Sequence, residues 1–227
     1  MKKSVGIIGA NGYTGSELVR LLAFHPNVEI KLLYSRSKAG VKISDLYSDL
    51  EAVCDLVLTN EISQVDILFL CLPHKESRNW LNDNSVSDET LIIDLGNDFR
   101  LETEFKNRNF IYGLPEIYFN EIKESKSIAN PGCFATAIQL ALLPLAKENL
   151  LKEVYTTGIT GSTGAGQSLQ PTTHFTWRND NISAYKTLKH QHVDEILKQI
   201  NSLNNQNVEL NFVPWRGDFA RGIFTSS

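Results

Sequence analysis

A glycine-rich turn near the N-terminus has the composition of a phosphate-binding loop. The sequence GANGYTG lies between an apolar run and a segment with helical periodicity. Glycines at these places permit a tight turn and let backbone N–H groups and a helix N-terminus approach a pyrophosphate. The predicted cofactor contacts are Gly9, Asn11, Gly12, Tyr13, Thr14 and Gly15. A glycine turn without a ligand is the alternative, but the strand, helix and position favour dinucleotide binding.

The residues after the next expected strand, 28–34, bear on which dinucleotide is bound. A site that prefers NAD places Asp or Glu there to bind the ribose hydroxyls. Here the strand is followed by Ser35, Arg36 and Ser37, a cation between two hydroxyls that suits a 2′-phosphate. An ordinary exposed arginine is the alternative, and the sequence favours NADP(H).

A cysteine with the setting of a nucleophile follows a chain break in NPGCFAT, residues 130–136. Pro131 and Gly132 end the preceding segment, so Cys133 is expected in the first turn of a helix. The positive end of the helix macrodipole favours thiolate over thiol there. The alternative is a small buried hydrophobic residue, which fits Cys54 and Cys71 better.

Two histidines in LKHQHVDEI could transfer protons for such a thiolate. If the backbone before the expected helix is extended, His190 and His192 point the same way, and Glu195 could cap the first turn. A surface pair and a metal site are the alternatives. The local sequence offers no third ligand, so no metal site is predicted.

A second glycine-rich loop, TGSTGAGQS at residues 160–168, follows an expected strand. Its small residues and exposed amides could surround a phosphate, a carboxylate or a nicotinamide. By composition alone it is no more than a flexible loop.

The elements that position these residues alternate between strand and helix. Expected strands cover residues 4–8, 28–34, 65–70 and 90–95, and residues 16–24 carry helical periodicity. Apolar runs of this kind are typical of a parallel sheet buried on both faces. The pattern predicts a doubly wound α/β sheet with ligands at the carboxyl ends of its strands.

A change in sequence texture near residue 130 predicts two domains, residues 1–130 for NADP and residues 131–227 for catalysis. The second is expected to contain helices at 133–145 and 193–203 and strands at 154–159 and 208–213. The final residues, GIFTSS, look like the middle of a strand, so this domain is expected to be incomplete at its C-terminus.

Composition excludes several classes of protein. The chain has 227 residues, 42% of them apolar, and 22 basic residues against 26 acidic ones, with no basic block for nucleic acid. No run approaches the ~20 apolar residues of a membrane span. Three widely spaced cysteines do not suggest a disulfide framework, which favours a reducing, cytoplasmic location.

Eight blocks together resemble the N-acetyl-gamma-glutamyl-phosphate reductase family, in order and at similar separations. They are GANGYTGSELVRLL at the start, LPH (72–74), DLGNDFR (94–100), YGLPE (112–116), NPGCFATA (130–137), GSTGAG (161–166), AYK (184–186) and HQHVDEI (190–196). The glycine turn alone is a weak signal, whereas the cysteine block preceded by YGLPE is specific.

The resemblance implies a reaction and a second domain. The family reduces an acyl phosphate to a semialdehyde with NADPH, in arginine biosynthesis, through a cysteine thioester. It implies Cys133 as the nucleophile, with His192 favoured over His190 as its acid/base partner. It also implies an α+β catalytic domain of the glyceraldehyde-3-phosphate dehydrogenase-like type and assembly as a dimer or tetramer. We expect Pro73 to contact the cofactor, and Arg100, Ser162 and Gly164 to contact the substrate.

Departures from the family leave the acyl group open. Members are longer, a glycine after LPH is Lys75 here, and residues 215–219 are unfamiliar. Acetyl is the family default, whereas an N-succinyl substrate would suit extra positive charge. An aspartate-semialdehyde dehydrogenase is the nearest alternative enzyme, and YGLPE and the histidine block argue against it. An NADPH-binding protein without catalysis is the alternative from another class.

Overall fold

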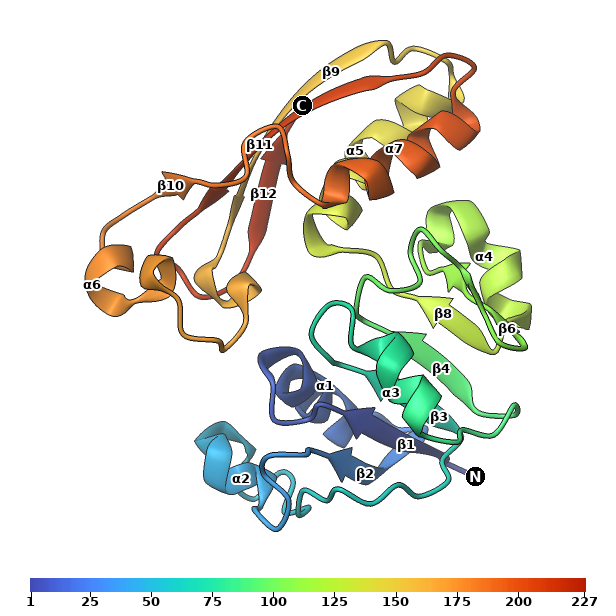
Figure 1. The fold of residues 1–227 in the computed structure, drawn as a ribbon, viewed down its shortest axis with the longest axis vertical. Helices are drawn as coiled ribbons and strands as arrows, with labels where there is room; N and C mark the ends of the chain where they lie inside the picture. Colours follow the sequence, from blue (N-terminus) through green and yellow to red (C-terminus); the bar gives the residue numbers. More distant parts are fainter. The chain divides into compact units, whose positions relative to one another are not determined.

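The chain forms two compact units, Met1–Asn130 and Pro131–Ser227 (Figure 1). The structure is a computed structural model that describes residues 1–227. No helix in either unit has the length and apolar character needed to cross a membrane.

The first unit is built on a six-stranded sheet whose strands all run parallel. Across the sheet the strands are β2 (Val28–Tyr34), β1 (Lys3–Ile8), β3 (Ile67–Leu70), β4 (Leu91–Asp94), β8 (Ser127–Ala129) and β7 (Ile111–Tyr112). The chain moves from β1 to β2 and then returns to β3 on the other side of β1. This reversal is a topological switch point, where parallel sheets bind ligands at the carboxyl ends of their strands.

Helices and loops cover both faces of this sheet, because its strands are apolar on both sides. Over one face pack α1 (Tyr13–Ala23) and α2 (Ile43–Leu46), which bury Val5, Ile7 and Leu33. Over the other pack α3 (Ser77–Asp83) and the segment that contains Phe99 and Phe110. The other elements of this unit are η1 (Ser48–Leu50), β5 (Glu104–Phe105), β6 (Arg108–Asn109) and α4 (Pro115–Glu124). The predicted doubly wound parallel sheet is confirmed.

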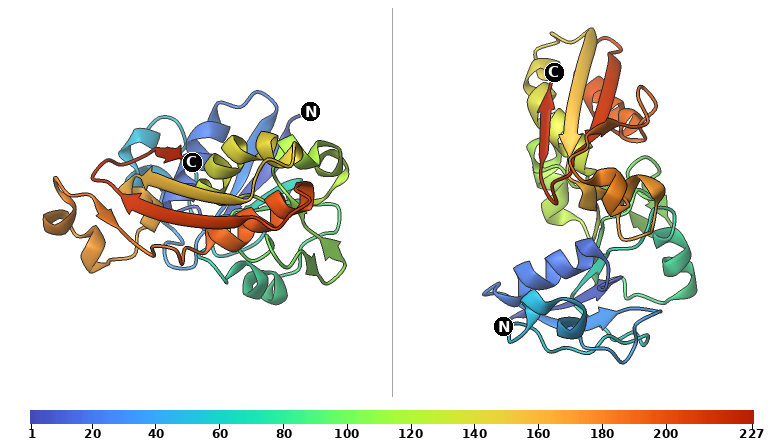
Figure 2. Two further views of the ribbon diagram at one scale, coloured as in Figure 1. Left: turned by 90° about the horizontal axis from the view of Figure 1, so that it is seen from above. Right: turned by 90° about the vertical axis from the view of Figure 1, so that its left-hand side faces the viewer.

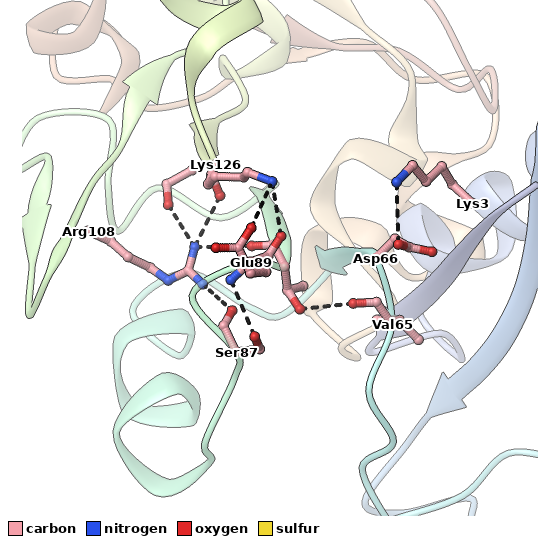
Figure 3. Close-up of polar contacts among 9 residues, drawn as sticks. Lys3, Val65, Asp66, Ser87, Glu89, Arg108 and Lys126 are labelled. Carbon is pink, nitrogen blue, oxygen red and sulfur yellow. Dashed lines mark hydrogen bonds and ion pairs between the residues drawn. The ribbon is translucent and has the colours of Figure 1, made fainter.

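Arg108 ties the β5–β6 hairpin to the amino-terminal ends of the strands (Figure 3). Its Nη1 donates to the carbonyl oxygens of Thr90 and Lys126, at 3.2 and 3.1 Å, and its Nη2 donates to that of Ser87 at 2.6 Å. Partial burial lowers the pKa of this guanidinium. Because β4 and β8 begin beside these carbonyls, Arg108 fixes the edge of the sheet opposite the ligand-binding edge.

The second unit has a four-stranded mixed sheet and two long helices. In order the strands are β10 (Ser183–Ala184), β11 (Glu209–Arg216), β9 (Glu153–Thr160) and β12 (Ile223–Ser226). The long strands β9 and β11 are parallel and lie side by side (Figure 2), while β10 and β12 run antiparallel to their neighbours. Helices α5 (Cys133–Lys147) and α7 (His192–Leu203) share one apolar cluster with β9 and β11. The expected α+β domain is confirmed.

Alternation along β9 and β11 gives this sheet one covered and one open face. Val154, Leu210 and Phe212 are buried against the helices, whereas Tyr155 points the other way and is 67% exposed. Since side chains alternate between faces of a strand, the helices account for only half of each strand's residues.

The polar stretch before residue 185 contains short elements that the sequence analysis did not predict. They are η3 (Pro171–Thr173) and α6 (Phe175–Arg178), followed by β10. Arg178 holds them together, because its buried guanidinium donates to the carbonyl oxygens of Thr172, Asn181 and Arg216. These contacts connect one side chain to irregular backbone on both sides of it and to the end of β11, so helical or strand periodicity does not reveal them.

Some boundaries also differ from prediction. Helix α1 begins at Tyr13 rather than at residue 16, and α7 begins at His192. The strand expected at 208–213 continues through Pro214 to Arg216, because β11 stays in register with the whole of β9.

Candidate active site

Two positions of the glycine turn after β1 leave no room for a side chain. Gly9 has a positive φ of 81°, and a Cβ there would lie 2.5 Å from the carbonyl oxygen of Cys71. A Cβ on Gly15 would lie 2.5 Å from the carbonyl oxygen of Gly9. The start of α1 is therefore packed directly onto the turn. Phosphate-binding loops need this close approach of helix and turn, and glycines permit it.

The N-terminus of α1 has no side-chain cap. Its N-cap residue, Gly12, makes no capping hydrogen bond with a side chain, and the next residues, Tyr13 and Thr14, are exposed. Backbone N–H groups in the first turn of a helix have no partner within the helix, so they can bind an anion. Tyr47, which the sequence analysis missed, steadies the turn through a 2.8 Å hydrogen bond from its hydroxyl to the carbonyl oxygen of Asn11.

The three residues after β2 divide into one buried and two exposed positions. Ser35 is buried, and its Oγ accepts a hydrogen bond from the Lys38 N–H, so it shapes the turn. Arg36 and Ser37 are exposed at the carboxyl end of β2. Pro73 is exposed just after β3, on the other side of β1. These residues and the glycine turn all follow the carboxyl ends of three neighbouring strands.

Arg100 is buried in the first unit. Its Nε donates to the carbonyl oxygen of Asn130 at 2.9 Å, and its Nη2 donates to that of Leu95 at 3.0 Å. Arg100 therefore connects the segments that follow β4 and β8. Its partner after β8, Asn130, lies three residues before Cys133 in the sequence.

Asp94, another residue that the sequence analysis missed, is fully buried at the end of β4. Its Oδ1 accepts hydrogen bonds from the Ser77 hydroxyl at 2.6 Å and the Gly96 N–H at 3.1 Å. Burial raises the pKa of Asp94 to about 6, although both hydrogen bonds oppose the rise. It is a buried acid at the ligand-binding edge of the sheet.

Cys133 is the first residue of α5, as predicted, and it is exposed. Gly132 is the N-cap, with extended backbone angles of −66° and 151°, and its carbonyl oxygen accepts from the Thr136 N–H at 2.8 Å. A 15-residue helix therefore begins at the thiol. Its N-terminal partial charge favours the thiolate, which is the nucleophilic form.

His190 and His192 lie close together, but the backbone between them does not have the predicted extended conformation. Gln191 has helical angles of −60° and −18°, so the backbone turns here and is not extended. The His192 N–H donates to Nδ1 of His190 at 3.3 Å, and the ring centroids are 4.7 Å apart. The turn arises because α7 begins at His192 itself. Both imidazoles are buried.

The Glu195 side chain caps a different helix from the one expected. Its Oε1 accepts a 2.7 Å hydrogen bond from the N–H of Gly132, at the start of α5. At the start of α7 the Gln191 side chain makes no capping bond, and Nδ1 of His190 accepts the N–H of His192. A contact between residues so distant in sequence cannot be read from a local capping pattern.

His190 sits among aromatic rings. The centroids of Phe134, Tyr185 and Phe212 lie 5.8, 5.6 and 5.5 Å from its own, all near edge-on. Burial lowers the pKa of His190 to about 3, and the charges of His192, Lys186 and Arg216 lower it further, against a small opposing effect of Glu195. His190 is therefore neutral at physiological pH.

Tyr185 and Arg216 complete this group. The Arg216 guanidinium lies 4.5 Å from the centroid of the Tyr185 ring. Burial raises the pKa of Tyr185, Arg216 opposes the rise, and the charge of Cys133 adds to it. The signal for Tyr185 was its place in the AYK block; nothing in the sequence marked Arg216 individually.

The loop after β9 is held by the segment that precedes β12. Its short helix is η2 (Ser162–Ala165). The N–H and the hydroxyl of Ser162 both donate to the carbonyl oxygen of Phe219, at 2.8 and 3.2 Å. Gly164 is exposed in the middle of the loop. These bonds anchor the start of the loop to the segment before β12.

The candidate cofactor-binding and catalytic residues form two sets, one in each unit. The glycine turn, Arg36 and Pro73 belong to the first, and Cys133 and the histidine pair belong to the second. No group of three or more histidine, cysteine, aspartate or glutamate side chains is arranged to hold a metal ion.

Two family models match the two units. The model described as "Semialdehyde dehydrogenase, NAD binding domain" matches residues 4–125, and "Semialdehyde dehydrogenase, dimerisation domain" matches residues 133–227. Solved structures with a similar fold include an aspartate semialdehyde dehydrogenase with NADP from Candida albicans (TM-score 0.68, 17% identity, 99% of this chain and 70% of that one). Another is aspartate semialdehyde dehydrogenase II from Vibrio cholerae (TM-score 0.70, 16% identity, 99% of this chain and 73% of that one).

Curated relatives are much more similar in sequence. Proteins named N-acetyl-gamma-glutamyl-phosphate reductase from Flavobacterium johnsoniae and Phocaeicola vulgatus are 52% and 49% identical. The matches cover 98% and 97% of this chain and 70% and 69% of those proteins. With a nicotinamide-dinucleotide domain, a helix-initial cysteine and a histidine pair in the expected places, the chain belongs to the N-acetyl-gamma-glutamyl-phosphate reductase family.

Proposed function

We propose that this chain reduces N-acetyl-gamma-glutamyl phosphate to N-acetylglutamate 5-semialdehyde with NADPH, releasing phosphate, as a step of arginine biosynthesis. The observation that carries the proposal is Cys133, an exposed thiol at the N-terminus of a long helix, in the unit that also holds two buried histidines. Sequence identity of about one half to reductases of that name supports the same reaction.

The thiolate of Cys133 performs the first step. Its sulfur attacks the acyl carbon, an S–C bond forms, and the bond to the phosphate oxygen breaks from a tetrahedral intermediate, leaving a thioester. A nicotinamide cofactor held at the carboxyl ends of β1, β2 and β3 would supply the hydride that reduces this thioester. Collapse of the second tetrahedral species breaks the S–C bond, releases the aldehyde and restores the thiolate. Backbone N–H groups in the first turn of α5 are suited to steady the oxyanions.

His192 is the better candidate for the acid/base role. His190 is enclosed by aromatic rings, its pKa is lowered to about 3, and its Nδ1 already accepts the His192 N–H. It is therefore a poor proton donor near neutral pH. His192, at the first position of α7, would protonate the developing alkoxide during reduction and act as a base in the reverse direction.

The residues at the carboxyl ends of β1, β2 and β3 fit a dinucleotide. A side chain at Gly9 or Gly15 would clash with neighbouring backbone atoms, so the turn stays close to the start of α1. The N-terminus of α1, which has no side-chain cap, would hold the pyrophosphate. Arg36, exposed at the end of β2 with Ser37 beside it, would bind the 2′-phosphate of NADP. Pro73, at the end of β3, would line the same crevice.

The roles of the remaining predicted residues differ in strength of support. Gly164 is exposed and can approach a substrate, whereas Ser162 and Arg100 already bind backbone carbonyl oxygens. Arg100 and Ser162 would therefore shape the site and contact substrate through their remaining hydrogen-bonding capacity. The acetyl group follows the names of the relatives. Arg216, whose guanidinium lies over the Tyr185 ring, would be the cation for an N-succinyl substrate.

A homo-oligomer and a cytoplasmic location are further parts of the proposal. The family model for the second unit is described as a dimerisation domain, and the open face of its sheet exposes Tyr155 and Phe224 at 67% each. A hollow of about 410 Å³ on this face is lined in part by Leu188 and Val213. A second copy of the chain would cover such a surface. Reducing conditions in the cytoplasm keep thiols such as Cys133 unoxidised, which supports that location.

The two alternatives receive less support. Aspartate-semialdehyde dehydrogenases are similar at 17% identity or less, which shows the fold alone. A non-catalytic NADPH-binding protein would not need an exposed, helix-initial thiol beside buried histidines.

Replacement of the nucleophile tests the reaction. We expect phosphate-dependent reduction of NADP with N-acetylglutamate semialdehyde, and loss of at least ~10³-fold in kcat for Cys133→Ala. Cys54→Ala, at a buried cysteine of the first unit, is the control and should keep its activity. The N-succinyl analogue, assayed in parallel, identifies the acyl group. Turnover that survives in Cys133→Ala would rule out the thioester route, and NADPH binding without turnover would support the binding-protein alternative.

Charge reversal at Arg36 tests the choice of cofactor. Arg36→Glu removes charge-assisted hydrogen bonds worth roughly 1.5–3 kcal/mol, so the Kd for NADPH should rise about 10- to 100-fold while that for NADH changes little. Lys38→Glu makes the same charge change two residues away and is the control. Fluorescence titration of NADPH measures both. Equal weakening by the two substitutions would mean that only general electrostatics is involved.

The buried, neutral state of His190 predicts a pH dependence of stability. Its pKa of about 3 lies below the ordinary value of about 6.5, so between these values the unfolded chain binds the proton and the folded chain does not. The free energy of unfolding should therefore fall with decreasing pH from about 6.5 toward 3. The slope should exceed that of His190→Gln by up to ~1.4 kcal/mol per pH unit.

Urea denaturation at several pH values between 4 and 7 measures this slope. His25→Gln, at an exposed histidine, is the matched control and should follow the wild type. Parallel curves for wild type and His190→Gln would show that His190 takes up its proton in the folded state as readily as in the unfolded chain.

A further inference from the structure

Glu195 joins the two helices that carry the reacting groups of the second unit. It lies in the first turn of α7, three residues after His192, and its side chain is buried at 3% exposure. Its Oε1 accepts a 2.7 Å hydrogen bond from the N–H of Gly132, which is the residue immediately before Cys133. One hydrogen bond therefore links the start of the cysteine helix to the first turn of the histidine helix.

The position is favourable for a carboxylate although it is buried. A buried charge is costly unless it is hydrogen-bonded, and the N-terminal ends of α5 and α7 both present partial positive charge to this group. The Gly132 N–H cannot be satisfied within α5, because the first N–H groups of a helix have no carbonyl partner. Glu195 meets both requirements at once.

The hydrogen bond between Gly132 and Glu195 affects the orientation of Cys133. Gly132 is the hinge residue at which the chain turns into α5, so fixing its N–H fixes the direction in which Cys133 leaves the helix. Residues three apart on a helix share a face, so Glu195 and His192 lie on the same side of α7. The hydrogen bond from Gly132 to Glu195 therefore contributes to the position of the thiol relative to the histidine pair.

We propose that Glu195 is a positioning residue that sets the thiol of Cys133 against the histidine pair through its hydrogen bond to Gly132. This inference rests on the proposed function. Glu195 acts through the residues it holds and needs no contact with substrate or cofactor. Its negative charge has a second, opposing effect: it makes the nearby thiolate less favourable, while the hydrogen bond orders the site.

Two substitutions separate the hydrogen bond from the charge. Glu195→Gln keeps the shape and an oxygen acceptor for Gly132 but removes the charge, whereas Glu195→Ala removes both. Asp194→Ala is the matched control, because Asp194 is an exposed acid in the same first turn of α7. Binding of NADPH by the first unit and a cooperative thermal transition check that each variant is folded.

The first readout is the rate of alkylation of Cys133 by iodoacetamide as a function of pH, which does not require turnover. Cys133 is the exposed cysteine, and the signal to follow is the one lost in Cys133→Ala. In Glu195→Gln the midpoint should move to lower pH by at least about 0.5 unit, since a negative charge near the thiolate is gone. Asp194→Ala should leave it unchanged to within about 0.2 unit, because water screens an exposed charge.

The second readout is steady-state kinetics. Glu195→Ala should lower kcat by at least about 30-fold with a change in KM of less than about 3-fold, as expected when only alignment is lost. Glu195→Gln should recover kcat to within about 5-fold of the wild type. The proposal is overturned if Glu195→Gln is as impaired as Glu195→Ala, or if its alkylation midpoint does not move. An inactive wild type with the expected alkylation shift would reject the proposed function and leave the positioning role intact.

Discussion

The second unit depends on how the N-terminus of α5 is held. A nucleophilic cysteine needs a fixed position and an environment that favours its thiolate, and a helix start supplies the second requirement without a neighbouring cation. The first requirement is met by packing. Phe134, the next residue, is buried among His190 and Phe212, and a Cβ on Gly158 of β9 would lie 2.6 Å from its ring. The side chain after the cysteine thus anchors the helix.

The first unit solves a related problem with glycines. Gly9 and Gly15 bring a strand, a turn and a helix within backbone contact, which leaves the N-terminus of α1 open for an anion. In both units, then, the positive end of a helix favours a negative group, a pyrophosphate in the first unit and a thiolate in the second. The burial of Asp94 and Arg100 at the carboxyl ends of β4 and β8 suggests that rigidity matters on this edge, since each binds backbone groups of the loops beside it.

Sequence reasoning succeeded where the physics is local. The NPG break predicted that a helix begins at Cys133, and glycine spacing predicted the turn between β1 and α1, because both depend on the conformations of a few adjacent residues. It failed where partners are distant. The carboxylate of Glu195 was assigned to its own helix but binds Gly132, and the backbone at Gln191 turns where an extended form was expected. The partly buried Arg108 and the buried Arg178 gave no signal, since arginines are usually exposed and the partners of these two are mostly carbonyl oxygens.

The central claim is that Cys133 carries the acyl group during the reaction. Incubation of the chain with N-acetyl-gamma-glutamyl phosphate in the absence of NADPH should stop at the thioester, and mass spectrometry of the digested protein then locates the adduct. The account predicts an added N-acetylglutamyl group on the peptide that contains Cys133, removable by hydroxylamine and lost when NADPH is supplied. An adduct on another residue, or none on a chain that turns over with NADPH, would contradict it.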